Sequence, residues 1–162
     1  MRDRFGAIFR LDFYQKDEIF KILKRTASIL EMNIQDDALT EIAGRSRGTP
    51  RIANRVLKRV RDFAQVKNVK EISLEDARSS LDSIGIDENG LENMDRKILK
   101  NLIVNYNGGP TGGKSLAISI NEDIQTIEDV YEPYLIKEGF IERTSRGRIA
   151  TDKAYALFDL KK

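Results

Sequence analysis

Apolar side chains in the first half of the chain recur every three or four residues, which is the spacing of amphipathic helices. The apolar stripe that follows Lys16 consists of Ile19, Ile22, Leu23, Ala27 and Leu30. The same spacing predicts helices over residues 36–44 and 49–66 and another that begins at Ser73. Ahead of them, the alternation of apolar and polar residues from Phe9 to Phe13 predicts one short strand.

Residues at the ends of these helices support their limits. Gly44 is a typical helix stop, Thr49 can cap the third helix, and Pro50 at its first position loses no hydrogen bond that the helix needs. Ser73 followed by Asp76 is the acid-completed form of the capping box. Because Asp has a shorter reach than Glu, its return bond to the backbone is the less secure half of that box. We therefore expect a bundle of four helices.

The pattern of the second half predicts helices that end in a hairpin. Helices fit residues 92–104 and 114–120, and another begins near a cap at Thr126, where Pro133 should disturb it because its ring removes a hydrogen bond. Two short apolar stretches then flank a turn at 143–147. Three helices followed by a β-hairpin is the winged-helix arrangement. The fold class is therefore mainly α, with a small hairpin near the end of the chain.

A turn-like stretch at residues 83–90 divides the chain into two expected domains, 1–85 and 86–162. The first has 17 basic and 13 acidic residues, and the second has 11 basic and 13 acidic residues, so the positive charge lies in the first. No apolar run reaches the length of a membrane span, and the N-terminus has no apolar signal region, so we expect a cytoplasmic protein.

Composition narrows the possible chemistry. The 162 residues include no Cys and no His, which excludes disulfides, thiol catalysis, Ser-His-Asp catalysis and the common zinc sites. We therefore do not expect hydrolysis by this chain alone. Residues 108–115 match the phosphate-binding loop of nucleotide hydrolases, but that loop needs a buried strand before it and a magnesium-holding carboxylate beyond it. No apolar run ending in an acidic pair follows Ser115, so a turn between helices is the favoured interpretation.

Two groups of arginines are candidates for anion binding. Seven basic residues without an intervening acid lie within 17 positions: Arg45, Arg47, Arg51, Arg55, Lys58, Arg59 and Arg61. They form either a solvated helix face or a site for phosphate or an acidic partner, and Arg51 lies in the first turn of its helix, where anions are favoured.

The second group surrounds the hairpin turn. Arg143, Arg146 and Arg148 can reach a phosphate backbone, although charge on an edge strand also protects against aggregation. Residues 122–132 carry five carboxylates and no basic residue, and phosphate would repel them. If this domain binds DNA, we expect it to use the hairpin, the wing, and not the preceding helix.

Several stretches form one ordered set: Arg2-Asp3-Arg4-Phe5-Gly6, Leu11-Asp12-Phe13-Tyr14, Arg45-Ser46-Arg47-Gly48-Thr49-Pro50-Arg51-Ile52-Ala53-Asn54-Arg55, Lys58-Arg59-Val60-Arg61-Asp62-Phe63-Ala64, Gly108-Gly109-Pro110, Thr126-Ile127-Glu128-Asp129-Val130, Glu132-Pro133-Tyr134-Leu135-Ile136, Gly139-Phe140, and Arg143-Thr144-Ser145-Arg146-Gly147-Arg148-Ile149-Ala150-Thr151. This set closely resembles the C-terminal part of the RuvB family, the hexameric ATPases that drive branch migration of Holliday junctions. The resemblance implies an AAA+ lid domain followed by a winged-helix domain, with the large ATPase domain absent.

The resemblance also implies roles for individual residues. Arg4 resembles the arginine finger, which acts on the nucleotide of a neighbouring subunit. Tyr14 resembles a nucleotide-contacting residue, and Arg51 resembles the second sensor arginine of the lid. Arg143 and Arg148 match the wing arginines that grip the DNA backbone, with Arg146 assisting them.

At the level of function, the resemblance implies ATP-driven branch migration in the intact protein. ATP and Mg²⁺ would serve that protein, without tight binding by this chain alone, which we expect to be inactive as an ATPase. The expected partners are duplex DNA at Holliday junctions, further copies of the protein in a hexamer, and RuvA through the large domain. The alternative function is a winged-helix transcription regulator with a helical dimerisation domain, which would read DNA through residues 126–138.

Overall fold

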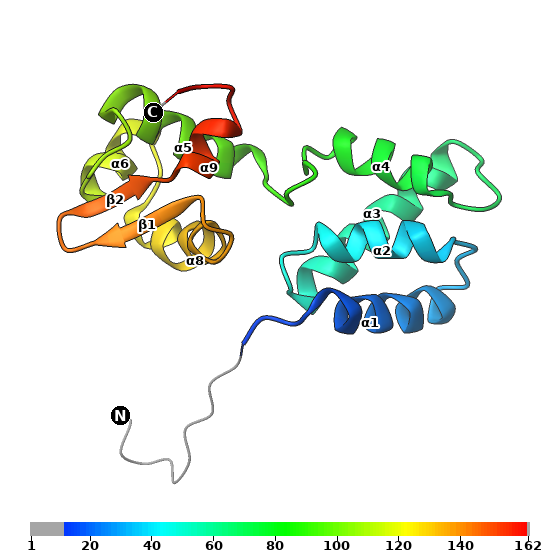
Figure 1. Ribbon diagram of the computed structural model, residues 1–162. Helices are drawn as coiled ribbons and strands as arrows, with labels where there is room; N and C mark the ends of the chain where they lie inside the picture. Colours follow the sequence, from blue (N-terminus) through cyan, green and yellow to red (C-terminus); the bar gives the residue numbers. More distant parts are fainter. Residues whose placement is uncertain (1–11, 162) are drawn as a thin grey trace, which may run out of the picture. The chain divides into compact units, whose positions relative to one another are not determined.

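The structure, a computed structural model, describes residues 12–161 (Figure 1). The chain separates into two compact units, with the division between Gly90 and Leu91. Both units are mainly helical, and one two-stranded hairpin lies in the second, so the predicted fold class is confirmed for the described residues.

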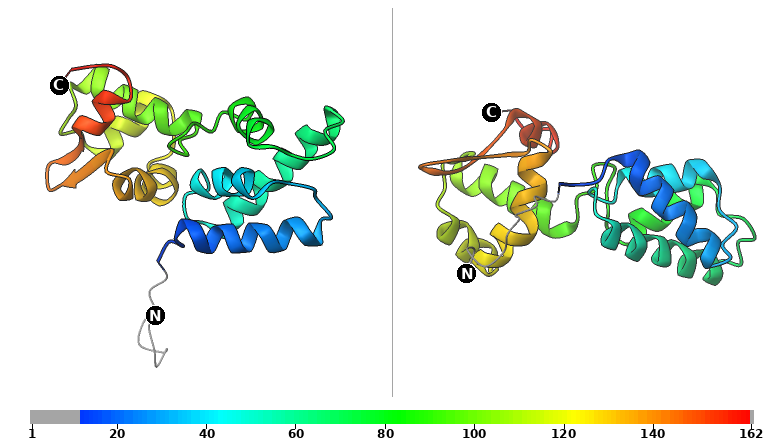
Figure 2. Two further views of the ribbon diagram at one scale, coloured as in Figure 1. Left: turned by 45° about the vertical axis from the view of Figure 1, so that its right-hand side comes forward. Right: turned by 90° about the horizontal axis from the view of Figure 1, so that it is seen from below.

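The first unit is a bundle of four helices. They are α1 (Lys16–Ile29), α2 (Asp36–Gly44), α3 (Pro50–Val66) and α4 (Leu74–Ser83). Helices α1 and α4 each pack against both α2 and α3 (Figure 2). The bundle is held by a single apolar core whose fully buried members include Ile19, Leu23, Leu57 and Leu81. The predicted stripe of α1 thus faces the core, as its spacing requires.

A side-chain cap explains where α4 begins, whereas the cap predicted for α3 does not form. Ser73 accepts a bond from the Asp76 backbone amide at 3.2 Å, and the Asp76 carboxylate accepts one from the Ser73 amide at 3.0 Å, so the capping box is complete. The two bonds from Ser73 lower the pKa of Asp76. Thr49 occupies the cap position of α3 as predicted, but its side chain makes no capping bond.

The ends of the first unit differ from the expected strand and the expected boundary. The predicted strand falls largely on residues outside the described range, and Asp12 and Phe13, which are described, belong to no strand. The boundary lies beyond the expected residue 85, because Ile86 is buried in the first core and the Gly90 carbonyl accepts a bond from Arg47 Nε at 3.0 Å. These contacts tie the connecting segment to the bundle.

The second unit is a winged-helix domain. Its elements are α5 (Asn93–Tyr106), α6 (Gly113–Ile120), α7 (Ile124–Thr126), the π-helical turn η2 (Ile127–Tyr131), α8 (Glu132–Lys137), β1 (Ile141–Thr144), β2 (Gly147–Ala150) and α9 (Asp152–Ala156). Its separate core includes the fully buried side chains of Leu99, Leu102, Leu116 and Phe140. The hairpin packs beside α8, α5 and α9 (Figure 1).

The third helix of this unit departs from its prediction in two ways. It starts earlier, because Asp123 accepts bonds from the amides of Gln125 and Thr126 and is the cap that Thr126 was predicted to be. It then widens into η2 immediately before the turn that contains Pro133. A proline lacks the amide hydrogen that the helix would use, and a π-turn ahead of it accommodates that loss. The prediction that Pro133 disturbs this helix is therefore confirmed.

No helix within residues 12–161 is long and apolar enough to cross a membrane. The same residues contain no group of three or more acidic or imidazole side chains that could hold a metal ion.

Candidate functional site

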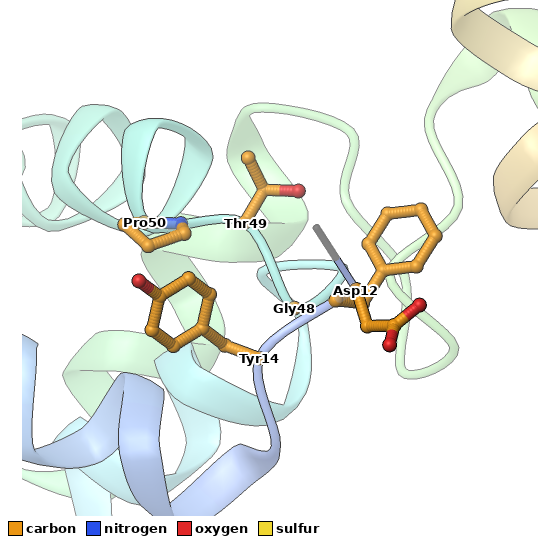
Figure 3. A pocket seen from close by; sticks show the side chains of 6 residues that line it. Asp12, Tyr14, Gly48, Thr49 and Pro50 are labelled. Carbon is orange, nitrogen blue, oxygen red and sulfur yellow. The ribbon is translucent and has the colours of Figure 1, made fainter. Parts of the chain in front are cut away.

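A shallow hollow of about 210 Å³ lies where the chain enters the first bundle. Its lining residues are Asp12, Phe13, Tyr14, Gly48, Thr49 and Pro50. The Tyr14 amide donates to the Gly48 carbonyl at 2.9 Å, which fixes the entering segment against the start of α3. Figure 3 shows the Tyr14 ring below Pro50, with the Asp12 carboxylate pointing away from it. The rings of Tyr14 and Phe13 and the proline form an apolar wall that suits a flat ring such as a nucleobase.

The loop ahead of α3 is held by two buried arginines. Arg45 donates from Nε and Nη2 to Glu41 Oε1, at 3.0 and 2.7 Å, and from Nη1 to the Ile86 carbonyl at 3.1 Å. Burial pushes the pKa of Glu41 upward, but the bonds from Arg45 and Arg78 outweigh it, so that pKa lies below its usual value. Arg47 is equally buried, at 7% exposure. These arginines position the loop and are closed to a ligand.

The predicted basic cluster is therefore divided by the fold. Arg45 and Arg47 point inward, whereas Arg51, Arg55, Lys58 and Arg59 lie exposed along α3. Arg51 is the second residue of α3 and follows Pro50 on the wall of the hollow, so Tyr14 and Arg51 come from segments that meet at one place. Arg51 does not itself line the hollow, so the prediction that Tyr14 and Arg51 act on one nucleotide rests on the meeting of their two segments.

The hairpin presents the other predicted group. Strands β1 and β2 pair antiparallel, with Arg143 opposite Arg148 and Thr144 opposite Gly147. The turn is therefore tighter than the predicted 143–147, because only Ser145 and Arg146 lie between the paired residues. Arg146 is exposed at the tip and forms no ion pair with a described residue.

We call Arg143, Arg148, Glu128 and Glu132 the wing cluster. Arg148 donates from Nε to Glu132 Oε1 at 2.6 Å and from Nη2 to Glu132 Oε2 at 3.2 Å, and Nη2 also contacts Glu128. Arg143 lies 3.5 Å from Glu128 and 3.7 Å from Glu132. The bond from Glu132 raises the pKa of Arg148, burial opposes the rise, and Glu128 adds to it. Arg148 is 7% exposed, whereas the Arg143 side chain is 55% exposed.

The glycine-rich segment that resembles a phosphate loop supports the hairpin. The helix α5 precedes it, and Thr111 exchanges two backbone bonds with Arg148, at 3.0 and 2.9 Å. A Cβ at Gly109 would lie 2.2 Å from the Arg148 carbonyl oxygen, and one at Gly113 would lie 2.6 Å from Arg148 Nη1. The glycines therefore permit close packing against β2, as a turn between helices and not as a nucleotide cradle.

Sequence reasoning missed the role of Glu128 and Glu132, which it treated only as groups that repel DNA. Their spacing of four residues on a predicted helix was a readable signal that both could face one partner. The candidate arginine finger, Arg4, lies outside the described residues. The predictions that Arg143, Arg146 and Arg148 contact DNA, and that Tyr14 and Arg51 contact a nucleotide, stay predictions.

Comparisons with known families divide the chain in two. Residues 14–87 match the family described as the RuvB AAA lid domain, and residues 88–159 match the RuvB C-terminal winged helix domain.

Individual relatives give the same result. The chain is 49% identical over 158 residues to the Holliday junction branch migration complex subunit RuvB of Fusobacterium nucleatum, covering 98% of this chain and 48% of the relative. It is 50% identical over 159 residues to the subunit of the same name from Clostridium kluyveri, covering 98% of this chain and 45% of that one. The solved structure of the Thermotoga maritima RuvB Holliday junction branch migration motor matches with a TM-score of 0.96 and 46% identity, over 99% of this chain and 54% of the other. The chain thus spans about half the length of these relatives.

Proposed function

Because this chain belongs to the RuvB family, we propose that it provides the lid and the DNA-gripping wing of an ATP-driven Holliday-junction branch-migration motor. The observation that carries the DNA part is the hairpin tip, where Arg146 is exposed and free of ion pairs with described residues and Arg143 is half exposed. Two guanidinium groups, one at the tip of the hairpin and one on its strand β1, suit the phosphates of a duplex without reading its bases.

Duplex binding by this chain tests the proposal. We expect labelled duplexes of unrelated sequence to bind with similar affinity and with a steep dependence on salt. The Arg143→Ala/Arg146→Ala variant should bind all of them about tenfold more weakly or worse. Its salt slope should fall by about two, one for each lost phosphate contact. The Lys100→Ala/Lys114→Ala variant removes the same charge from exposed positions of the same unit and is the matched control. Equal affinities of the two variants for duplex DNA would exclude the wing as the DNA-binding surface.

We assign the nucleotide part to the first unit. In the intact motor, Tyr14 would lie against the nucleoside, Arg51 would reach the terminal phosphate from the lid, and Arg4 would act on the nucleotide of a neighbouring subunit in a hexamer. The hollow supports the assignment of Tyr14 because its wall is apolar and its volume suits part of a nucleotide. ATP supplies the driving reaction and Mg²⁺ neutralises its phosphates, and both would be held mainly by residues outside this chain. Appreciable ATP turnover by the chain itself would contradict this division of labour.

Partners and location follow from the same assignment. We propose that the intact protein acts at Holliday junctions in the cytoplasm and meets RuvA through its large domain. The alternative, a transcription regulator that reads DNA through residues 126–138, is not favoured, because Glu128 and Glu132 of that segment are engaged with the wing. Strong preference for one duplex sequence would restore it.

A further inference from the structure

The wing arginines face carboxylates of their own domain. Arg143 and Arg148 lie directly opposite each other across the hairpin, where two like charges destabilise the strand pair. Glu128 and Glu132 lie against the same arginines and compensate both charges. The cluster therefore holds two cations and two anions, and it is neutral before any DNA arrives.

The two carboxylates differ in how easily they can be exchanged. Glu132 is 1% exposed and binds Arg148 through both of its oxygens, so its departure would leave a buried charge without a partner. The Glu128 side chain is 33% exposed, and its Oε1 serves Arg148 and Arg143 together, the latter at 3.5 Å. Solvent can reach Glu128, and its contact with Arg143 is too long for a strong hydrogen bond.

We propose that Glu128 occupies the place of a DNA phosphate in the unbound wing and limits the affinity of the wing for duplex DNA. This inference rests on the proposed function of the wing. A carboxylate and a phosphodiester both offer paired oxygens to a guanidinium fork, so each can satisfy Arg143. When a phosphate binds, Arg143 exchanges Glu128 for it, while Glu132 keeps Arg148 and the base of the hairpin in place.

The decisive variants remove or shorten this one carboxylate in the full chain. Glu128→Gln should tighten the binding of a labelled duplex by about twofold to fivefold, the range of an exposed ion pair. Glu128→Asp keeps the net charge but withdraws the carboxylate by one methylene, so it should also tighten binding. The control is Asp129→Asn, which changes the charge of the adjacent exposed residue, one that pairs with neither wing arginine. It should change affinity only slightly.

A double-variant comparison identifies the arginine involved. In the Arg143→Ala background, Glu128→Gln should have lost most of its effect, because the released cation is no longer there. The inference is overturned if Glu128→Gln and Asp129→Asn tighten binding equally, if Glu128→Gln weakens it, or if its effect persists without Arg143. Thermal unfolding of each variant checks that the wing stays folded, and Glu128→Asp provides the measurement should Glu128→Gln not fold. If the unmodified chain binds duplexes through residues other than the wing, the proposed function itself fails, and that result comes from the Arg143→Ala/Arg146→Ala variant.

Discussion

Replacing Arg148 by Met should destabilise the second unit strongly and leave the first unit unchanged. Arg148 lies across the buried carboxylate of Glu132, with donors at 2.6 and 3.2 Å and little exposure to solvent. Methionine fills a similar volume but carries no charge. Within residues 12–161, Arg143, which is 3.7 Å away and half exposed, would then be the cation left in an ion pair with the buried carboxylate.

The expected loss of stability in Arg148→Met follows from the burial of Glu132. Removing one partner of a buried ion pair costs about 3–5 kcal/mol, because the remaining charge is held away from water. A unit of about 70 residues has a total stability of about 4–11 kcal/mol, so the variant should lose a large share of it. Its Tm should fall by the order of 20 °C. The Arg148→Met/Glu132→Met variant should recover most of the loss, since an apolar pair replaces a buried ion pair at little cost.

Tyrosine fluorescence during urea unfolding measures this effect in one chain. The protein has no Trp, and four of its five Tyr residues, Tyr106, Tyr131, Tyr134 and Tyr155, lie in the second unit. The signal therefore reports mainly on that unit, while circular dichroism also follows the first bundle. A loss below about 1 kcal/mol in Arg148→Met, or a double variant weaker than the single one, would refute the buried pair as described.

Two further predictions concern acid sensitivity and the glycine-rich support. The pKa of Glu41 is lowered in the folded protein, so its contribution to stability is complete above pH 4.5, its ordinary value, and is lost as the pH falls through the lowered pKa. The free energy of unfolding of the first unit, measured with urea, should therefore fall less on acidification in Glu41→Gln than in the unchanged chain. Parallel plots of this free energy against pH for the two proteins would contradict the bonds from Arg45. Gly147→Ala places a Cβ 2.3 Å from the Thr111 carbonyl oxygen at a φ of 136°, so it should cost the second unit about 1–3 kcal/mol. Gly112→Ala meets no atom within 4 Å, and its thermal unfolding should match that of the unchanged chain.

Local chemistry made much of the fold readable from the sequence. The helix over 36–44 has the predicted limits, and the capping box at Ser73 and Asp76 forms with both of its bonds. These features depend on interactions between residues a few positions apart, so they can be predicted without knowing the tertiary structure. The Asp123 cap was missed, because a second candidate cap, Thr126, stood three positions later.

The site was less readable, because an arginine carries the same charge wherever it lies. Arg45 and Arg51 belong to one basic run, yet the first is buried against Glu41 and the second is exposed at the start of α3. Arg143 and Arg148 belong to one hairpin, yet only Arg143 is substantially open to solvent. The spacing of Glu41 and Arg45 allows their local pair, but the burial of Arg45 beside the Ile86 carbonyl and the pairing of Arg148 with Glu132 depend on contacts between distant segments, which no local pattern contains.

The sequence by itself determined the helices, the hairpin and the identity of the cations, since periodicity, caps and charge are properties of neighbouring residues. Only the tertiary structure decided which cations are available. Packing brought the Ile86 carbonyl and Asp82 to Arg45 and brought Glu132 to Arg148. Burial of each guanidinium made a partner obligatory, because an unpaired charge in the interior is too unfavourable to remain.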